Sequence, residues 1–162
     1  MNAPTHRLIT SRGEFHDALR SAFAEAAAAG AREIWLCDAN FADWPLSERA
    51  VIENLTRWIN SGRRLTVLAQ TFDEVVRRHS HWAEWRRQWS HVVQCRTETE
   101  LEVADFPTIC LVADVISVRL VDPVHYRGLA SHEGADAKIC REAIDAVLQR
   151  SIETFPVTTL GL

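Results

Sequence analysis

The order of elements in this chain is decided by residues 33–70, which read EIWLCDANFADWPLSERAVIENLTRWINSGRRLTVLAQ. The first five residues form a short apolar run that predicts a buried strand. A polar loop follows, and then an amphipathic helix capped by Ser47. The turn Asn60-Ser61-Gly62 precedes a second apolar strand, Arg64–Gln70. Strand, helix and strand in this order predict a βαβ unit with two parallel strands.

A helix is predicted upstream of this unit. Ser11 and Glu14 have capping-box spacing, and Phe15, Leu19 and Phe23 then recur on one helical face. Gly30 marks the end of the helix, because glycine is the usual residue just after a helical C-terminus. We expect this helix to pack against the core.

The alternation of helices and strands continues downstream. The expected elements are a helical region over Asp73–Ser90, a strand at about 91–96, strands over 107–113 and 115–121, and a helix over about 135–153. We therefore predict one α/β domain over residues 1–162, with a mixed sheet and helices on its faces.

Composition excludes several classes of protein. The 162 residues are 47% hydrophobic and 25% charged, as in ordinary soluble domains. A net charge of −4 gives no global attraction to phosphate backbones, so nucleic-acid binding would need a local basic patch. Met1 to Arg12 is polar, and no stretch approaches the ~18 apolar residues of a membrane span. We expect a cytoplasmic protein with no membrane partner.

The cysteines and histidines do not form a metal motif. Four cysteines are dispersed without a C-x-x-C pair, which is typical of reduced thiols buried in a core. His79 and His81 lie two residues apart, so on a helix they point in different directions. We predict no metal site and no cofactor.

Three segments carry a resemblance to a known family. They are Cys110-Leu-Val-Ala-Asp114, Arg119, and His125-Tyr-Arg-Gly128. They resemble the closing half of a poorly characterised bacterial domain of phospholipase D-like character, which is appended to some GNAT-type acetyltransferases or stands alone. The resemblance runs from about Glu33 to Leu162 and includes Ile34–Asp38, Arg64–Gln70 and the terminal Phe155–Leu162. It implies half of a phospholipase D-like fold.

The resemblance also implies that the catalytic residues are gone. Active relatives carry His-x-Lys-x-x-x-x-Asp, in which the histidine attacks phosphorus and the lysine holds phosphate oxygens. With Asp114 at the aspartate position, Pro107 stands at the histidine position and Ile109 at the lysine position. Neither side chain can act as nucleophile or stabilise an oxyanion. We predict no catalytic residue and a non-catalytic binding or accessory module.

The candidate ligand-binding residues follow the predicted strands and their loops. They are Asp38, Asp114, Arg119, His125, Tyr126 and Arg127. Asp114 is also an ordinary turn former, which is the interpretation we favour, and Arg119 alternates with apolar residues and could be solvated. Loops after strand C-termini form the ligand crevice in open α/β sheets. We therefore expect a small anion or phosphorylated ligand at the edge of the sheet where the strands have their C-terminal ends.

Two alternative functions stay open, and a second copy of the chain is the expected partner. Residues 77–89 mix four arginines with three tryptophans, a composition that suits an RNA- or DNA-binding face. Trp82, Trp85 and Trp89 share one helical stripe, which favours packing against a core or a partner subunit instead. A phosphodiesterase with a rearranged histidine, such as His125, is the other alternative. Since active relatives pair two halves across a pseudo-twofold axis, we predict a homodimer.

Overall fold

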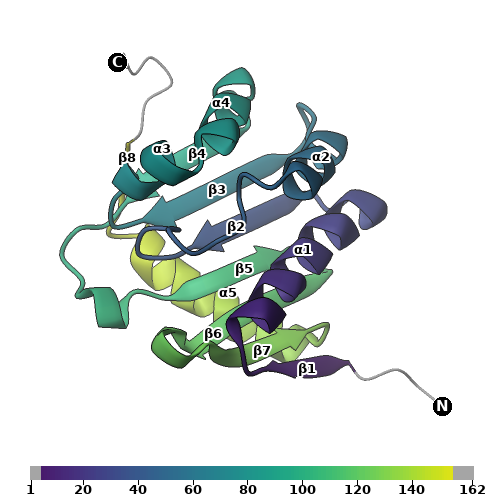
Figure 1. Cartoon of the computed structure of the whole chain (residues 1–162), viewed down its shortest axis with the longest axis vertical. Coiled ribbons are helices and arrows are strands. Elements are labelled where there is room, and N and C mark those ends of the chain that lie inside the picture. The colour runs from purple at the N-terminus through teal and green to yellow at the C-terminus, as the bar shows by residue number, and fades with distance from the viewer. Residues whose placement is uncertain (1–4, 155–162) are drawn as a thin grey trace.

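The computed structural model describes residues 5–154 and contains one eight-stranded mixed sheet (Figure 1). The strand order is β1-β7-β6-β5-β2-β3-β4-β8. The strands are β1 (His6–Ile9), β2 (Glu33–Cys37), β3 (Arg64–Ala69), β4 (Val93–Thr97), β5 (Thr108–Val112), β6 (Ile116–Asp122), β7 (Arg127–Ser131) and β8 (Ile152–Glu153). The helices are α1 (Arg12–Ala29), α2 (Arg49–Trp58), α3 (Asp73–Arg78), α4 (Ser80–Gln88) and α5 (Gly134–Leu148), with 3-10 turns η1 (Val103–Asp105) and η2 (Pro123–His125). The predicted mixed-sheet α/β class is confirmed.

The directions of the strands define two edges of the sheet. β2, β3 and β4 run parallel, whereas β5 runs antiparallel to β2 and pairs Ile109 with Cys37. The ends of β2–β4 therefore lie beside the start of β5, and we call this side the C-terminal edge. The opposite side, the N-terminal edge, holds the starts of β2–β4 and the turn between β5 and β6. None of the helices formed by the described residues is long and apolar enough to cross a membrane.

Helix α1 forms as its sequence predicts. The Ser11 hydroxyl accepts the Glu14 N–H at 3.1 Å, and the Glu14 carboxylate accepts the Thr10 N–H at 2.7 Å. Gly30 ends the helix with a φ of 64°, a left-handed conformation that costs glycine little. The cap and the stop signal are both local, which explains why the pattern predicts them.

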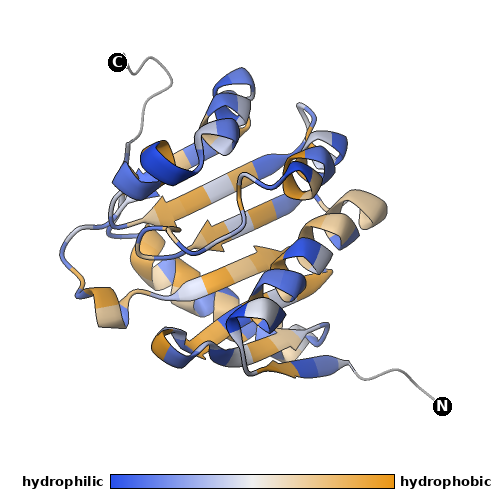
Figure 2. Cartoon of the chain, viewed as in Figure 1, coloured by the Kyte–Doolittle hydropathy of each residue, from blue (hydrophilic) through white to orange (hydrophobic). Residues whose placement is uncertain are grey.

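The core lies in two layers, one on each face of the sheet. Helices α1 to α4 cover one face and α5 crosses the other, and the strands between them are predominantly apolar (Figures 1 and 2). Successive strand residues point to opposite faces, so Ile34 packs under α1 to α4 while Trp35 packs on the α5 side. Trp58, on α2, is fully buried and donates from Nε1 to the Ala31 carbonyl at 2.6 Å.

Several predicted boundaries are wrong. Helix α2 begins at Arg49 rather than after a Ser47 cap, and the Ser47 hydroxyl instead accepts the Trp82 N–H at 3.5 Å. The helical region over 73–90 breaks at His79, whose ring Nε2 lies 2.8 Å from the Phe41 carbonyl. Helix α5 ends at Leu148, and the chain then pairs β8 antiparallel to β4.

Two strands that the patterns did not predict, β1 and β7, form the end of the sheet opposite β8. β7 contains Gly128, where a Cβ atom would lie only 1.9 Å from the Arg119 carbonyl oxygen. The close approach of β6 therefore requires glycine there. The terminal segment Phe155–Leu162, which contributes to the family resemblance, lies outside the described residues.

Candidate functional site

A small pocket of about 180 Å³ opens at the C-terminal edge on the α5 side of the sheet. Pro107, Thr108 and Arg119 line it, together with Asp105 and Pro123. Arg119 lies on β6 directly across from Ile109 on β5, and its side chain is half-buried. No carboxylate among residues 5–154 lies within 4 Å of its guanidinium, since the ion pairs formed by these residues leave Arg119 out. The pocket thus contains a cation that has no acidic partner among the described residues.

Asp38 lies next to this pocket and holds the backbone around it. Its Oδ1 accepts the Thr108 hydroxyl at 2.8 Å, and its Oδ2 accepts the backbone N–H groups of Phe41 at 2.8 Å and Asn40 at 3.3 Å. Burial raises the pKa of the Asp38 carboxyl, although these hydrogen bonds act in the opposite direction. Since both oxygens are engaged, Asp38 fastens the 39–41 loop to the start of β5.

Pro107 and Ile109, which the family resemblance places at the positions of the catalytic histidine and lysine, differ in their surroundings. Pro107 is half-buried at the rim of the pocket. Ile109 is only 1% exposed and packs in the core beneath α5, with Leu68, Leu111 and Ile144 in the same cluster. The one cation in this pocket, within the described part of the chain, comes from the neighbouring strand as Arg119.

Tyr126 points to the opposite side of the sheet from Arg119. It follows η2 with a φ of 54°, and its hydroxyl donates to Asp43 Oδ2. The other oxygen of Asp43 accepts Arg12 Nε at 2.7 Å, and the Tyr126 ring lies 6.3 Å from the Phe15 ring on α1. The bond to the carboxylate raises the pKa of Tyr126.

His125 and Arg127 flank Tyr126 and are both exposed. His125 Nδ1 lies 2.8 Å from Asp122 Oδ2, and this hydrogen bond lowers the pKa of Asp122. The structure therefore places Asp38 beside the pocket of Arg119 through its hydrogen bond with Thr108, and it separates Arg119 from Tyr126.

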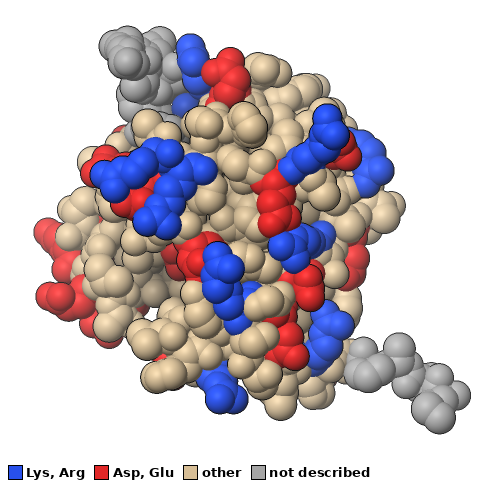
Figure 3. Space-filling model, viewed as in Figure 1, with Lys and Arg blue, Asp and Glu red and all other residues tan. Residues whose placement is uncertain are grey.

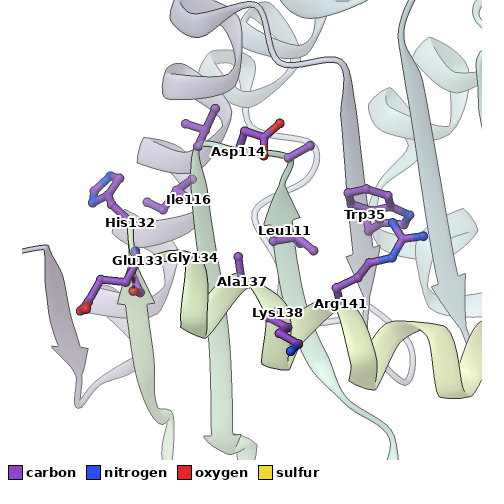
Figure 4. A pocket seen from close by; sticks show the side chains of 13 residues that line it. Trp35, Leu111, Asp114, Ile116, His132, Glu133, Gly134, Ala137, Lys138 and Arg141 are labelled. Carbon is purple, nitrogen blue, oxygen red and sulfur yellow. Dashed lines mark hydrogen bonds between the residues drawn. The ribbon is translucent and has the colours of Figure 1, made fainter.

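Asp114 lies at the N-terminal edge, in the turn between β5 and β6, with a φ of 62°. It lines a larger hollow of about 630 Å³ beneath α5 (Figure 4). Trp35 and Leu111 form an apolar wall of the hollow, and Lys138 and Arg141 project from α5. The Arg141 guanidinium lies 4.1 Å from the Trp35 ring centroid and pairs with Asp145 at 3.0 Å. The sequence patterns missed this hollow because its residues come from separate segments. The only local indication of it is the i, i+3 spacing of Lys138 and Arg141, which places two cations on one face of α5.

The tryptophans of the segment 77–89 belong to the core. Trp82 and Trp85 are buried, Trp89 is partly buried, and Arg86 is buried with its Nε 3.2 Å from Cys95 Sγ. The arginines at the surface of this segment lie beside carboxylates. Arg77 and Arg78 pair with Glu74, and Arg87 pairs with Glu84. Figure 3 shows the same mixture of basic and acidic side chains over the face covered by α1 to α4. The packing interpretation of this stripe fits the structure, because its tryptophans offer little surface for stacking bases.

The cysteines occur as predicted. Cys37, Cys95, Cys110 and Cys140 are buried and unbonded to one another. Within residues 5–154, no cluster of three histidine, cysteine or acidic side chains could hold a metal ion.

No protein-family model matches this chain, and no curated protein sequence matches it. Solved structures match its fold at low sequence identity. TrmBL2, an archaeal chromatin protein with a novel mode of DNA binding, gives a TM-score of 0.67 at 10% identity over 95% of this chain. NucT from Helicobacter pylori gives 0.59 at 10% identity over 92% of this chain and 98% of NucT. Nuc from Salmonella typhimurium, a phospholipase D family member, gives 0.57 at 11% identity over 94% of this chain and 99% of Nuc.

These likenesses show a phospholipase D-like fold. The chain spans just over half of TrmBL2, 55% of its length. At 10–11% identity the likeness concerns the fold alone.

Proposed function

We propose that this chain is a non-catalytic binding module on a phospholipase D-like fold. The observation that carries the proposal is the pair Pro107 and Ile109 at the positions of the nucleophile and the phosphate clamp. Proline offers no atom that can attack phosphorus, and the Ile109 side chain is enclosed in the core. The covalent mechanism of active relatives lacks both its attacking group and its cation.

The ligand we propose is a small anion or a phosphorylated group bound in the edge pocket. Arg119 lies across from position 109, so a cation remains close to where the clamp would stand. The guanidinium offers several N–H donors that suit phosphate oxygens, and no carboxylate of the described residues occupies them. The pocket, at about 180 Å³, is large enough for such a group.

A hydrolysis assay tests the loss of catalysis. The purified chain is incubated with bis(p-nitrophenyl) phosphate without added metal, and we expect no release of nitrophenol above the buffer rate. Turnover that His125→Ala abolishes would overturn the proposal in favour of a phosphodiesterase with a rearranged histidine. His132→Ala is a matched control, because His132 is also exposed and paired with a carboxylate, Glu25.

A thermal-shift titration with inorganic phosphate tests the anion site. A ligand at ~100 times its dissociation constant stabilises the native state by roughly 2.7 kcal/mol. We expect Arg119→Ala to remove most of the shift and Arg49→Ala to keep it, since Arg49 is 92% exposed on α2. Equal shifts in both variants would mean that Arg119 is a solvated strand residue.

Nucleic-acid binding is the second candidate function, and the likeness to TrmBL2 favours it. The DNA binding described for TrmBL2 belongs to a protein of which this chain covers only 55%. Fluorescence anisotropy with a labelled 20-mer oligonucleotide tests this candidate directly. Binding that weakens as salt rises supports it.

We also propose that the chain forms a homodimer. On the α5 face of the sheet, β1 and β7 extend beyond the single helix. Leu8 is 69% exposed there, and Ile139 on α5 is 46% exposed. Exposed apolar side chains on a partly covered sheet face favour a contact with a second copy.

A further inference from the structure

Three arginines gather at the N-terminal edge of the parallel strands, the side of the sheet opposite the pocket of Arg119. Arg32 precedes β2, Arg63 and Arg64 open β3, and His91 lies just before β4. The Arg64 N–H donates to the Arg32 carbonyl at 3.2 Å, and the Leu65 N–H donates to the Val92 carbonyl at 2.9 Å. These backbone bonds place the three segments side by side.

Arg32, Arg63 and Arg64 have no acidic partner among the described residues, a feature that they share with Arg7, Arg57 and Arg127 but not with eight ion-paired arginines. The ion-paired arginines are Arg12, Arg20, Arg49, Arg77, Arg78, Arg87, Arg141 and Arg150. Across residues 5–154, no carboxylate lies within 4 Å of Arg32, Arg63 or Arg64. Arg63 Nη1 donates to the Trp58 carbonyl and so caps α2, whereas Arg32 and Arg64 are exposed. Like charges held together repel one another, and a bound anion would relieve that repulsion.

A polar groove of about 410 Å³ runs along this edge. Arg63, Arg64 and His91 line it with Ser61, Ser90 and Gln94, and Glu153 is its single carboxylate among the described residues. Glu153 is engaged by Gln94 Nε2 at 3.4 Å. The groove therefore combines two cations with several neutral hydrogen-bonding side chains.

A pair of stacked aromatic rings at the groove favours a nucleic acid over polyanions that have no bases. The exposed His91 ring stacks on Trp89, with ring centroids 5.8 Å apart and planes inclined by 29°. A ring presented beside arginines is a platform on which a base can stack. Among residues 5–154, none of the large exposed apolar side chains lines the groove, so none of them would insert from it into a lipid surface.

We infer that this groove binds the phosphate backbone of a single-stranded nucleic acid. Arg63 and Arg64, which line the groove, contact the phosphates, and His91, supported by Trp89, receives a base. The inference rests on nucleic-acid binding as the function and places that function at an edge far from Arg119 in the sheet. It supplies the local basic patch that a chain with a net charge of −4 would need.

The test uses the whole chain and fluorescein-labelled dT20 in anisotropy titrations from 50 to 200 mM NaCl. The double variant R63A/R64A is compared with R77A/R78A, which removes the same charge from α3, where both arginines pair with Glu74. At about 0.7 counterions per phosphate contact, we expect R63A/R64A to reduce the salt slope by roughly 1.4. We expect a loss of affinity of about tenfold or more in R63A/R64A, and less than about twofold in R77A/R78A. Loss of the stacked ring in His91→Ala should cost about fivefold or more.

Each result has a distinct meaning once circular dichroism shows that the variants are folded. If the wild type does not bind dT20, the nucleic-acid function fails and the groove fails with it. If the wild type binds and both double variants lose affinity equally, nucleic-acid binding stands but the groove is overturned. Binding to phosphatidylserine vesicles in place of dT20 would overturn the inference in favour of a membrane surface. Unchanged affinity in His91→Ala would overturn the stacking contact.

Discussion

Ile109→Lys introduces a lysine at the position that we propose corresponds to the catalytic lysine of active phospholipase D-like enzymes, and it tests whether that position is closed to a charged side chain. The Ile109 side chain is 1% exposed, and its burial contributes about 1.5–3 kcal/mol. A lysine there would place an ammonium group among apolar side chains, and the nearby Asp38 oxygens already accept hydrogen bonds. An uncompensated buried charge costs about 3–5 kcal/mol. We therefore expect Ile109→Lys to remove at least ~3 kcal/mol from an unfolding free energy of about 5–15 kcal/mol.

Urea denaturation followed by tryptophan fluorescence measures this loss. Val121→Lys is the matched control, because Val121 lies on the adjacent strand β6 and is 68% exposed. A surface substitution of this kind changes stability by about 0.5 kcal/mol or less. Ile109→Val removes one methyl group and should cost about 0.5–1.5 kcal/mol, which keeps the measurement informative if the lysine variant does not fold.

An unfolding free energy of Ile109→Lys within ~1 kcal/mol of the wild type would contradict this expectation. That result would mean that the lysine amine reaches solvent at the C-terminal edge, as a catalytic lysine must. The position would then be open, and Pro107→His/Ile109→Lys would be expected to recover hydrolysis. With a closed position, the double variant stays inactive.

Three further predictions follow from other parts of the structure. Because burial raises the pKa of Asp38, this carboxyl keeps its proton to a higher pH in the folded state than in the unfolded state. The contribution of Asp38 to stability is therefore present at low pH and is lost as pH rises through the folded pKa. Urea titrations at several pH values between 4 and 7 should therefore show wild-type stability falling relative to Asp38→Asn, and parallel curves would contradict this. Burial raises the pKa of Cys95 to about 11 and also raises the pKa values of Cys37 and Cys110. A thiol-specific disulfide reagent at pH 7.5 should therefore label the four buried cysteines only after denaturation. Rapid labelling of the native chain would show that a thiol is exposed. Light scattering should give twice the 18.4 kDa of one chain, and a mass near 18.4 kDa at every concentration would exclude the homodimer.

Local patterns were sufficient for the parts of the fold that depend on neighbours in the sequence. The cap at Ser11, the stop at Gly30 and the apolar run Glu33–Cys37 each involve contacts within a few residues or a single strand. The assignment of Pro107 and Ile109 to the positions of a catalytic pair rests on residue identity and on the family resemblance, and it stays a prediction. The one-face spacing of Trp82 and Trp85 favoured their burial, because helical periodicity is also a local property of the sequence.

The edges of the sheet and the directions of side chains could be decided only by the tertiary structure. The strands β1, β7 and β8 form because a distant strand offers free hydrogen-bonding groups, as β4 does for β8. Arg119 and Tyr126 lie seven positions apart in the sequence, yet β6, η2 and the left-handed Tyr126 place them on opposite faces. Likewise, the segments of Arg63, Arg64 and His91 lie side by side because β2, β3 and β4 run parallel. The sequence alone determined which charges and apolar groups the chain carries, whereas strand pairing between distant segments decided which of them share a surface.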